Sequence, residues 1–222
     1  MVILQACVSF APPSPMVTFG GPKTVPVKSS DVGLGLGAGA ALFEDSRTPG
    51  NGWFGRYKYG LGKKLDLGID AMSISYSDRR AFSAKLVSRF QLKEDIRIEG
   101  GIGVADAASG KSINGDIGLT CGSINENKAW NYYFTVRIGW AKGYPGNILT
   151  GDRTSSDTIA PPNVFIGLIN VGTQATINKN MKFIFEGGFG YLFPEGHKPG
   201  PTLYISCGLL FNIEKISASR KK

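Results

Sequence analysis

The chain has 222 residues and a formal net charge of +8, from 25 Lys and Arg against 17 Asp and Glu. Its 42% hydrophobic content and mean hydropathy of −0.04 exclude a disordered polyelectrolyte, and no run approaches the roughly 20 apolar residues of a membrane-spanning helix. One His and three separated Cys exclude a four-ligand zinc site and a disulfide framework, so we expect no metal and no cofactor. Gly is unusually frequent, at 31 residues, which together with 11% aromatic residues predicts many short strands.

The first seven residues form a short apolar start that ends at Cys7. The run Leu4-Gln5-Ala6-Cys7 resembles the lipobox of bacterial lipoproteins, which implies a signal-peptide remnant over 1–7 and a lipid on Cys7. The alternative is that a short apolar start happens to precede a cysteine. Residues 8–30 carry five prolines, a composition typical of an extended tether and not of a packed element.

From residue 31 onward, apolar residues alternate with Gly, polar or charged residues, which is the period of β-strands. The seventh run is the clearest, with an unbroken apolar row from Trp130 to Trp140 on one face. In the third run the apolar face changes after Asp70, which predicts a β-bulge near Ala71. The ten runs cover residues 32–43, 53–61, 65–76, 82–92, 96–104, 113–121, 130–140, 164–177, 183–193 and 203–213.

Two architectures fit ten such strands: a soluble barrel or sandwich with its apolar face inward, and a membrane barrel with its apolar face outward. The polar face mixes Gly, Ser, Asn and charges of both signs, while the apolar rows are long and aromatic, which favours the membrane barrel. Connections alternate in length, which predicts that both termini lie on the side of the short turns. The short connections are 62–64, 93–95, 123–128 and 178–180; the others, mostly longer, are 44–52, 77–80, 106–112, 143–162 and 194–201.

The last run carries a second signature. Residues 206–213 read Ser-Cys-Gly-Leu-Leu-Phe-Asn-Ile, which is similar to the terminal assembly signal of outer-membrane barrels through Ser206, Gly208, Phe211 and Ile213. With the ten phased runs, residues 31–213 resemble a small outer-membrane β-barrel protein of Gram-negative bacteria. The chain departs from many members by a basic tail over 214–222 in place of a terminal aromatic residue.

This resemblance implies an all-β fold, a single ten-stranded antiparallel up-and-down transmembrane β-barrel in the bacterial outer membrane. Both termini would be periplasmic, and residues 8–30 would be a periplasmic tether. Outer-membrane lipid and the barrel assembly machinery would be its partners.

Twelve charged side chains are predicted to project into the lumen. We expect interlocking ion pairs to fill it, since a barrel of roughly eight strands is just wide enough for its own side chains. The alternative is a narrow polar pore with a mild anion preference from the two excess cations. These residues are Arg56, Lys58, Asp66, Asp70, Lys85, Arg89, Arg97, Glu99, Asp116, Arg137, Lys182 and Glu186.

No catalytic constellation is evident. Enzymes of the family generally place a His with Ser or acidic partners, whereas the single His197 follows Glu195 in a turn-rich loop. Cys121 and Cys207 are expected on the outward face, as small apolar residues. No basic cluster combines with stacking aromatic residues, so we expect no nucleic-acid partner.

The prediction is therefore a cell-envelope barrel with a structural, surface-contact or narrow, porin-like role, and not an enzyme. The loop over 143–162 is the expected site for a small solute or surface ligand, because long loops are usually functional or mobile. A soluble ligand-binding β-barrel is the first alternative, and a barrel hydrolase is the second.

Overall fold

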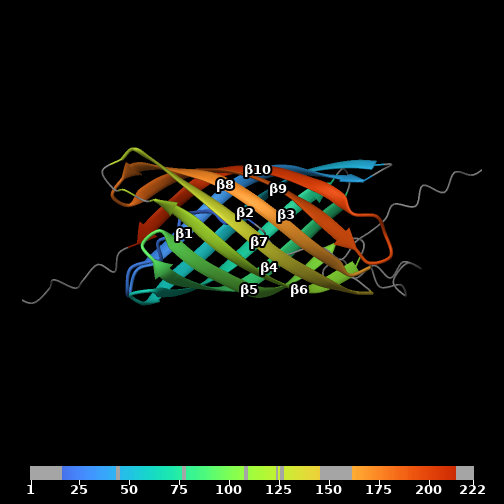
Figure 1. Cartoon of the computed structure of the whole chain (residues 1–222), viewed down its shortest axis with the longest axis horizontal. Coiled ribbons are helices and arrows are strands. Elements are labelled where there is room, and N and C mark those ends of the chain that lie inside the picture. The colour runs from blue at the N-terminus through green and yellow to red at the C-terminus, as the bar shows by residue number, and fades with distance from the viewer. Residues whose placement is uncertain are drawn as a thin grey trace, which may run out of the picture.

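The computed structural model describes residues 17–43, 46–76, 79–107, 110–123, 125, 128–145 and 162–213. Each of its strands pairs antiparallel with its sequence neighbours, and β1 pairs with β10 to close a barrel (Figure 1). This confirms the predicted ten-stranded up-and-down architecture. The strands are β1 (Ser30–Phe43), β2 (Ser46–Gly62), β3 (Leu65–Tyr76), β4 (Arg79–Lys93), β5 (Ile96–Ala107), β6 (Gly110–Ser123), β7 (Trp130–Tyr144), β8 (Val164–Asn178), β9 (Met181–Pro194) and β10 (Gly200–Ile213).

The outer wall is apolar and the lumen is polar, the inverse of a soluble barrel. Trp130, Phe134 and Phe185 point outward and are 50%, 41% and 46% exposed, as the period of two predicts. Trp130 and Trp140 stand near the two ends of the apolar row of β7. Ten residues of strand span roughly 33 Å, or about 25 Å along the axis of a tilted strand, which matches the apolar band of a membrane barrel.

No helix among the described residues is long and apolar enough to cross a membrane.

We call the end of the barrel at which β1 begins and β10 ends the terminal end. Here β2 and β3, β4 and β5, and β8 and β9 are each joined by two residues, and β6 and β7 by residues 124–129. At the opposite end β1 and β2, β3 and β4, and β5 and β6 are also joined by only two residues. The prediction of longer connections at this end is therefore wrong for three of the five. Residues that were predicted to form these connections are instead paired between neighbouring strands, as Arg47 of β2 is with Leu42 of β1.

The β-bulge predicted near Ala71 is also absent from this strand. Ala71 pairs with Gly55 on one side and Ala84 on the other in unbroken register. The apolar residues change face for a different reason, because Met72 points into the lumen and packs against an apolar cluster there. Register shifts occur instead near the terminal end, between Gly60 and Gly62, Gln91 and Lys93, and Thr176 and Asn178.

That apolar cluster contains part of the N-terminal segment. Residues 17–29, which we name the plug, enter the lumen, where Thr18 and Phe19 are fully buried, whereas Pro26, Val27 and Lys28 are exposed. The extended periplasmic tether predicted over 8–30 is therefore wrong for these residues, and 8–16 lie outside the described residues. The plug turns into β1 at the terminal end, where the Lys28 N–H donates to the Gly60 carbonyl at 2.9 Å and the Gly60 N–H donates to the Ser29 carbonyl at 3.0 Å.

Candidate functional site

The lumen contains a chain of ion pairs that crosses four strands. Arg137 of β7 forms ion pairs with Glu99 of β5 and with Asp116 of β6. The distance from Arg137 Nη1 to Asp116 Oδ1 is 2.6 Å. Glu99 also binds Arg97 Nη2 at 2.9 Å, and Asp116 Oδ2 binds Lys85 Nζ of β4 at 2.6 Å. None of these five side chains is more than 1% exposed. The chain links neighbouring strands from inside the barrel and excludes water from this part of the lumen.

Two further ion pairs follow directly from strand register. Arg56 lies opposite Asp70 in the β2–β3 ladder, and Asp66 lies opposite Arg89 in the β3–β4 ladder. Directly opposed residues on one face have Cβ atoms about 4.5–5.5 Å apart, within reach of a salt bridge. Arg56 Nε donates to Asp70 Oδ1 at 2.6 Å, and Arg89 Nε lies 3.0 Å from Asp66 Oδ1. Nine of the twelve predicted lumen charges thus take part in ion pairs.

Glu186 has a different role from the one predicted. Its carboxylate accepts hydrogen bonds from two consecutive plug N–H groups, those of Thr18 at 2.8 Å and Phe19 at 2.9 Å. The hydroxyls of Tyr133 and Tyr204 donate to the same carboxylate at 2.8 and 2.5 Å. Four donors therefore satisfy this buried charge without a cation, and Glu186 attaches the plug to β9.

Other wall charges bind the backbone of the plug. The Arg56 guanidinium donates to the carbonyls of Val17, Thr18 and Phe19, and Arg97 Nη1 donates to the Gly21 carbonyl at 2.5 Å. Asp66 Oδ2 accepts from the Val25 N–H at 3.0 Å. Hydrogen bonds to charged groups contribute more than neutral ones, so these contacts fix the position of the plug against the wall in this conformation.

Phe19 is the apolar anchor of the plug. Its ring meets Phe54 edge-on, with centroids 4.5 Å apart and an interplanar angle of 77°. The rest of its surroundings are Tyr133, Ile184 and Leu210, all buried. A Cβ on Gly33 or Gly208 would come within 2.8 Å of the Phe19 ring, so glycine on β1 and β10 is what admits this ring.

Sequence reasoning missed the plug residues and their wall partners. Phe19 is followed by Gly20 and Gly21 within a Pro-rich segment, and an isolated aromatic residue there was the available signal. A second signal was the run of glycines on one face of 33–39, which the prediction of a crowded lumen used only in general terms. The missed residues include Thr18, Phe19, Phe54, Tyr133 and Tyr204.

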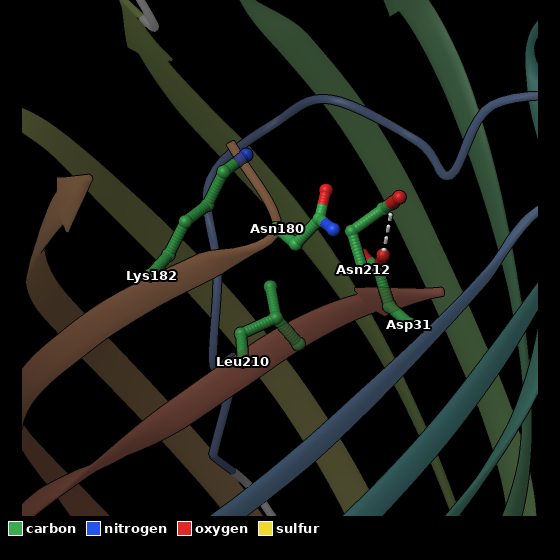
Figure 2. A pocket seen from close by; sticks show the side chains of 5 residues that line it. All are labelled: Asp31, Asn180, Lys182, Leu210 and Asn212. Atoms are coloured by element: carbon green, nitrogen blue, oxygen red, sulfur yellow. Dashed lines mark hydrogen bonds between the residues drawn. The ribbon is translucent and has the colours of Figure 1, made fainter. Parts of the chain in front are cut away.

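The remaining two lumen residues lie apart from the ion pairs. Lys58 is buried but takes part in no ion pair with another described residue. Lys182 is half-buried and lines a shallow pocket at the terminal end, together with Asp31, Asn180, Leu210 and Asn212 (Figure 2). The pocket has a volume of about 10 Å³, enough for about one water molecule and too small for a small-molecule site.

The assembly-signal residues all fall on β10. Ser206 and Gly208 face the lumen, whereas Ile213 is exposed on the outer wall and Phe211 is half-buried there. Cys207 is likewise exposed and Cys121 is half-buried, and neither forms a disulfide. Cys7, the tail over 214–222 and positions 146–161 of the predicted ligand loop lie outside the described residues.

His197 lies exposed in the connection between β9 and β10, where its N–H donates to the Pro194 carbonyl at 3.2 Å. Within the described part of the chain, no three His, Cys, Asp or Glu residues group as metal ligands would.

A closed barrel with an apolar outer wall and a charged, plugged lumen belongs to the transmembrane β-barrel class. No protein-family model matches the sequence, and no curated protein matches it either. Among solved structures, the fold is similar to an outer membrane channel from Pseudomonas putida F1, with 10% identity and a TM-score of 0.48 over 89% of this chain and all of that chain.

Two further solved structures are similar. One is the Neisserial surface protein A, with 9% identity and a TM-score of 0.43 over 82% of this chain and 96% of that one. The other is the outer membrane protease OmpT from Escherichia coli, with 12% identity and a TM-score of 0.41 over 89% and 99%. At these identities the similarities concern the barrel architecture and assign no activity.

Proposed function

We propose that the chain is an outer-membrane β-barrel of the Gram-negative envelope that forms a narrow pore, closed in this conformation by the plug. The observation that carries the proposal is the glycine face of β1 and β10, where Gly33 and Gly208 leave space that Phe19 of the plug occupies. A wall that is filled permanently would use its own side chains for this purpose. A wall shaped around a separate segment favours a segment that can leave.

The charged lumen supports the same proposal. Glu99, Arg137 and Asp116 pair with one another on the wall and not with the plug, so withdrawal of the plug would leave a polar path, as in barrels with a water-filled interior.

We further propose that both termini are periplasmic. Both ends of the barrel carry three two-residue connections, but the longest connection at the terminal end is 124–129, whereas the opposite end carries the much longer 145–163. Outer-membrane barrels keep short turns in the periplasm and long loops outside. The loop over 143–162 would then face the surroundings, which supports the proposal that a small solute or surface ligand contacts the barrel there.

The proposed partners follow from the two faces of the wall. The apolar outer row supports contact with outer-membrane lipid, and Ser206, Gly208, Phe211 and Ile213 at the end of β10 support recognition by the barrel assembly machinery.

The alternatives are weaker on specific grounds. A soluble ligand-binding barrel would leave Phe134 and Phe185 exposed to water and would need an interior cavity, whereas the plug occupies the centre of this lumen. A barrel hydrolase is disfavoured because His197, the single histidine of the sequence, lies exposed next to Gly196 in a turn and not in the lumen. We therefore propose a barrel without enzymatic activity.

Conductance in planar bilayers tests the pore. We expect the full-length protein to be almost silent and Phe19→Asp to open frequently, because a carboxylate cannot stay among Phe54, Ile184 and Leu210 without a partner. Val27→Asp is the matched control, since it adds the same charge to an exposed position of the plug and should stay closed. A Phe19→Asp barrel that folds and remains silent would show that the lumen does not conduct.

A disulfide lock gives the reverse experiment. Asn170 Nδ2 lies 2.9 Å from Thr18 Oγ1, so Thr18→Cys and Asn170→Cys, in a chain whose own cysteines are serine, place two thiols near enough for a short disulfide-containing thiol cross-linker to bind the plug to β8. Combined with Phe19→Asp, the cross-linked barrel should be silent and should open on reduction. Equal conductance before and after reduction would show that the current does not depend on the position of the plug.

A further inference from the structure

Three cations converge below the centre of the plug. Lys58 of β2, Arg89 of β4 and Arg97 of β5 all point into the lumen and are 3%, 0% and 0% exposed. Arg97 reaches the carbonyl of Gly21, and Lys58 Nζ lies 3.7 Å from the point where a Cβ on Gly20 would stand. The two glycines of the plug therefore lie against Arg97 and Lys58.

Arg89 joins the same cluster across β3. Gly68 pairs with Lys58 in the β2–β3 ladder, and a Cβ on Gly68 would lie 2.8 Å from Arg89 Nη2 and 3.3 Å from the Lys58 Cα. A Cβ on Gly68 would also lie 2.3 Å from the Tyr57 carbonyl oxygen, so glycine is needed here both for the close approach of β2 and for the Arg89 guanidinium. The missing side chain thus leaves room for this guanidinium on the lumen side of β3.

The donors of this cluster are not saturated by protein. Within the described residues, Lys58 Nζ has no hydrogen bond or ion pair, and Nη1 and Nη2 of Arg89 and Nε of Arg97 have no hydrogen-bond acceptor. Asp66 is shared between Arg89 and the Val25 N–H, and Glu99 is shared between Arg97 and Arg137. Asp66 Oδ1 lies 3.0 Å from Arg89 Nε and accepts no hydrogen bond among the described residues, and neither carboxylate forms an ion pair with Lys58.

Charge counting gives the same result. The ion-pair network contains five cations and four carboxylates, and Lys58 raises the number of cations to six. Glu186 is not counted, because plug N–H groups and tyrosine hydroxyls already occupy its oxygens. A buried cation without a counter-charge is strongly unfavourable. Ammonium and guanidinium donors form their best hydrogen bonds with anions.

We propose that Lys58, Arg89 and Arg97 bind a small monovalent inorganic anion, of the size of chloride, between the wall and Gly20 of the plug. A small ion fits these surroundings: apart from the chain neighbours of Gly20, only Lys58 Nζ and Ile184 Cδ1 come within 4 Å of its Cβ position, so there is a gap beside this residue. The anion supplies the missing negative charge and bridges the wall to the plug. The site does not depend on whether the lumen conducts.

Thermal unfolding of the full-length protein in detergent micelles tests the site. At constant ionic strength, replacing gluconate, which is too large for the gap, by chloride should raise the melting temperature until the site is saturated, because a ligand of the folded state stabilises it. Lys58→Met should abolish this rise and should melt higher than wild type in gluconate, because the unpaired charge is gone. Equal melting temperatures in the two salts, or an undiminished rise in Lys58→Met, would overturn the proposal.

Lys85→Met is the matched control. It removes an ammonium of the same lumen that is paired with Asp116 at 2.6 Å, so it should lower stability and leave the chloride-dependent rise intact. Should Lys58→Met fail to fold, Lys58→Gln takes its place with the same expected loss. Crystals soaked in bromide give a direct readout: an anomalous peak within hydrogen-bond distance of Lys58 Nζ supports the site, and a map without one there refutes it.

Discussion

Two regions of one lumen are filled in opposite ways. Across β4 to β7, the wall fills the interior with its own charged side chains, and Lys85, Glu99, Asp116 and Arg137 satisfy one another. Along β1 and β10 the wall presents glycine, and residues 17–29 of the same chain fill the space. The first region is part of the barrel, whereas the second is a docking site for a segment.

The difference is also one of contact range. In the charged region Asp66 and Arg89 are paired because they are ladder neighbours, so register alone determines the interaction. The plug depends on contacts such as Glu186 with Thr18, which are 168 residues apart. Long-range docking by a short segment can be undone without breaking the ladders. The charged region should therefore govern the stability of the barrel, and the plug should govern access to its lumen.

The most severe test of this division is Arg137→Leu. It leaves Glu99 and Asp116 short of a shared cation in a fully buried network, and breaking a buried ion pair costs about 3–5 kcal/mol. We expect the free energy of unfolding in lipid vesicles to fall by this amount. The neighbouring Val136→Leu, on the outer wall, should change it little. A loss below about 1 kcal/mol, the range of an exposed pair, would mean that the charged region does not hold the barrel together.

The next test concerns the outer wall behind the charged region. Val136 lies midway between Trp130 and Trp140 on β7, at the centre of the apolar row. Val136→Arg should cost about 2–4 kcal/mol in vesicles, and Ile138→Arg, nearer to the end of the row, should cost less. Folding titrations measure both. Equal costs at the two positions would argue against a bilayer around this wall.

An arginine on the inward face is not expected to be harmless, although a polar lumen suggests so from sequence. Thr135 is fully buried and its hydroxyl lies 2.9 Å from that of Thr120, so Thr135→Arg would have to displace packed groups. Overpacking of this kind typically costs about 1–3 kcal/mol.

The strands and the ion pairs could be predicted from sequence because both obey the period of two. Alternation assigned Arg56 and Asp70 to the same face, and neighbouring antiparallel strands then brought them together. The plug could not be predicted in this way, because Phe19 and its partner Phe54 belong to no common pattern. The wrong prediction of a bulge near Ala71 has the same origin, because Met72 points inward to pack against the apolar cluster that contains Phe19 of the plug.

Phe19→Ala measures how separable the plug is. Complete burial of Phe19 among Phe54, Ile184 and Leu210 would give a loss of about 3–5 kcal/mol in a permanent core. Because the proposed pore requires the plug to undock from an intact barrel, we expect the free energy of barrel unfolding to fall by less than this, while amide hydrogen exchange at Thr18 and Phe19 accelerates. If Phe19→Ala left the exchange rates of these amides as in the wild type and lowered the free energy of unfolding by the full amount of about 3–5 kcal/mol, the plug would be a permanent part of the core.

The smallest effect on stability is expected for Cys7→Ser, which tests the proposed lipid. If Cys7 is the lipidated N-terminus, the ten residues to Val17 span at most roughly 36 Å, so the lipid and the docked plug are close enough to be coupled. One acyl chain binds a membrane only weakly, and the barrel is already embedded, so the lipid would help assembly more than retention. Cys7→Ser should leave the melting temperature unchanged and lower the yield of folded barrels in the native host. Mass spectrometry decides the premise, because an unmodified peptide that includes residues before Cys7 would show that no lipid is attached there.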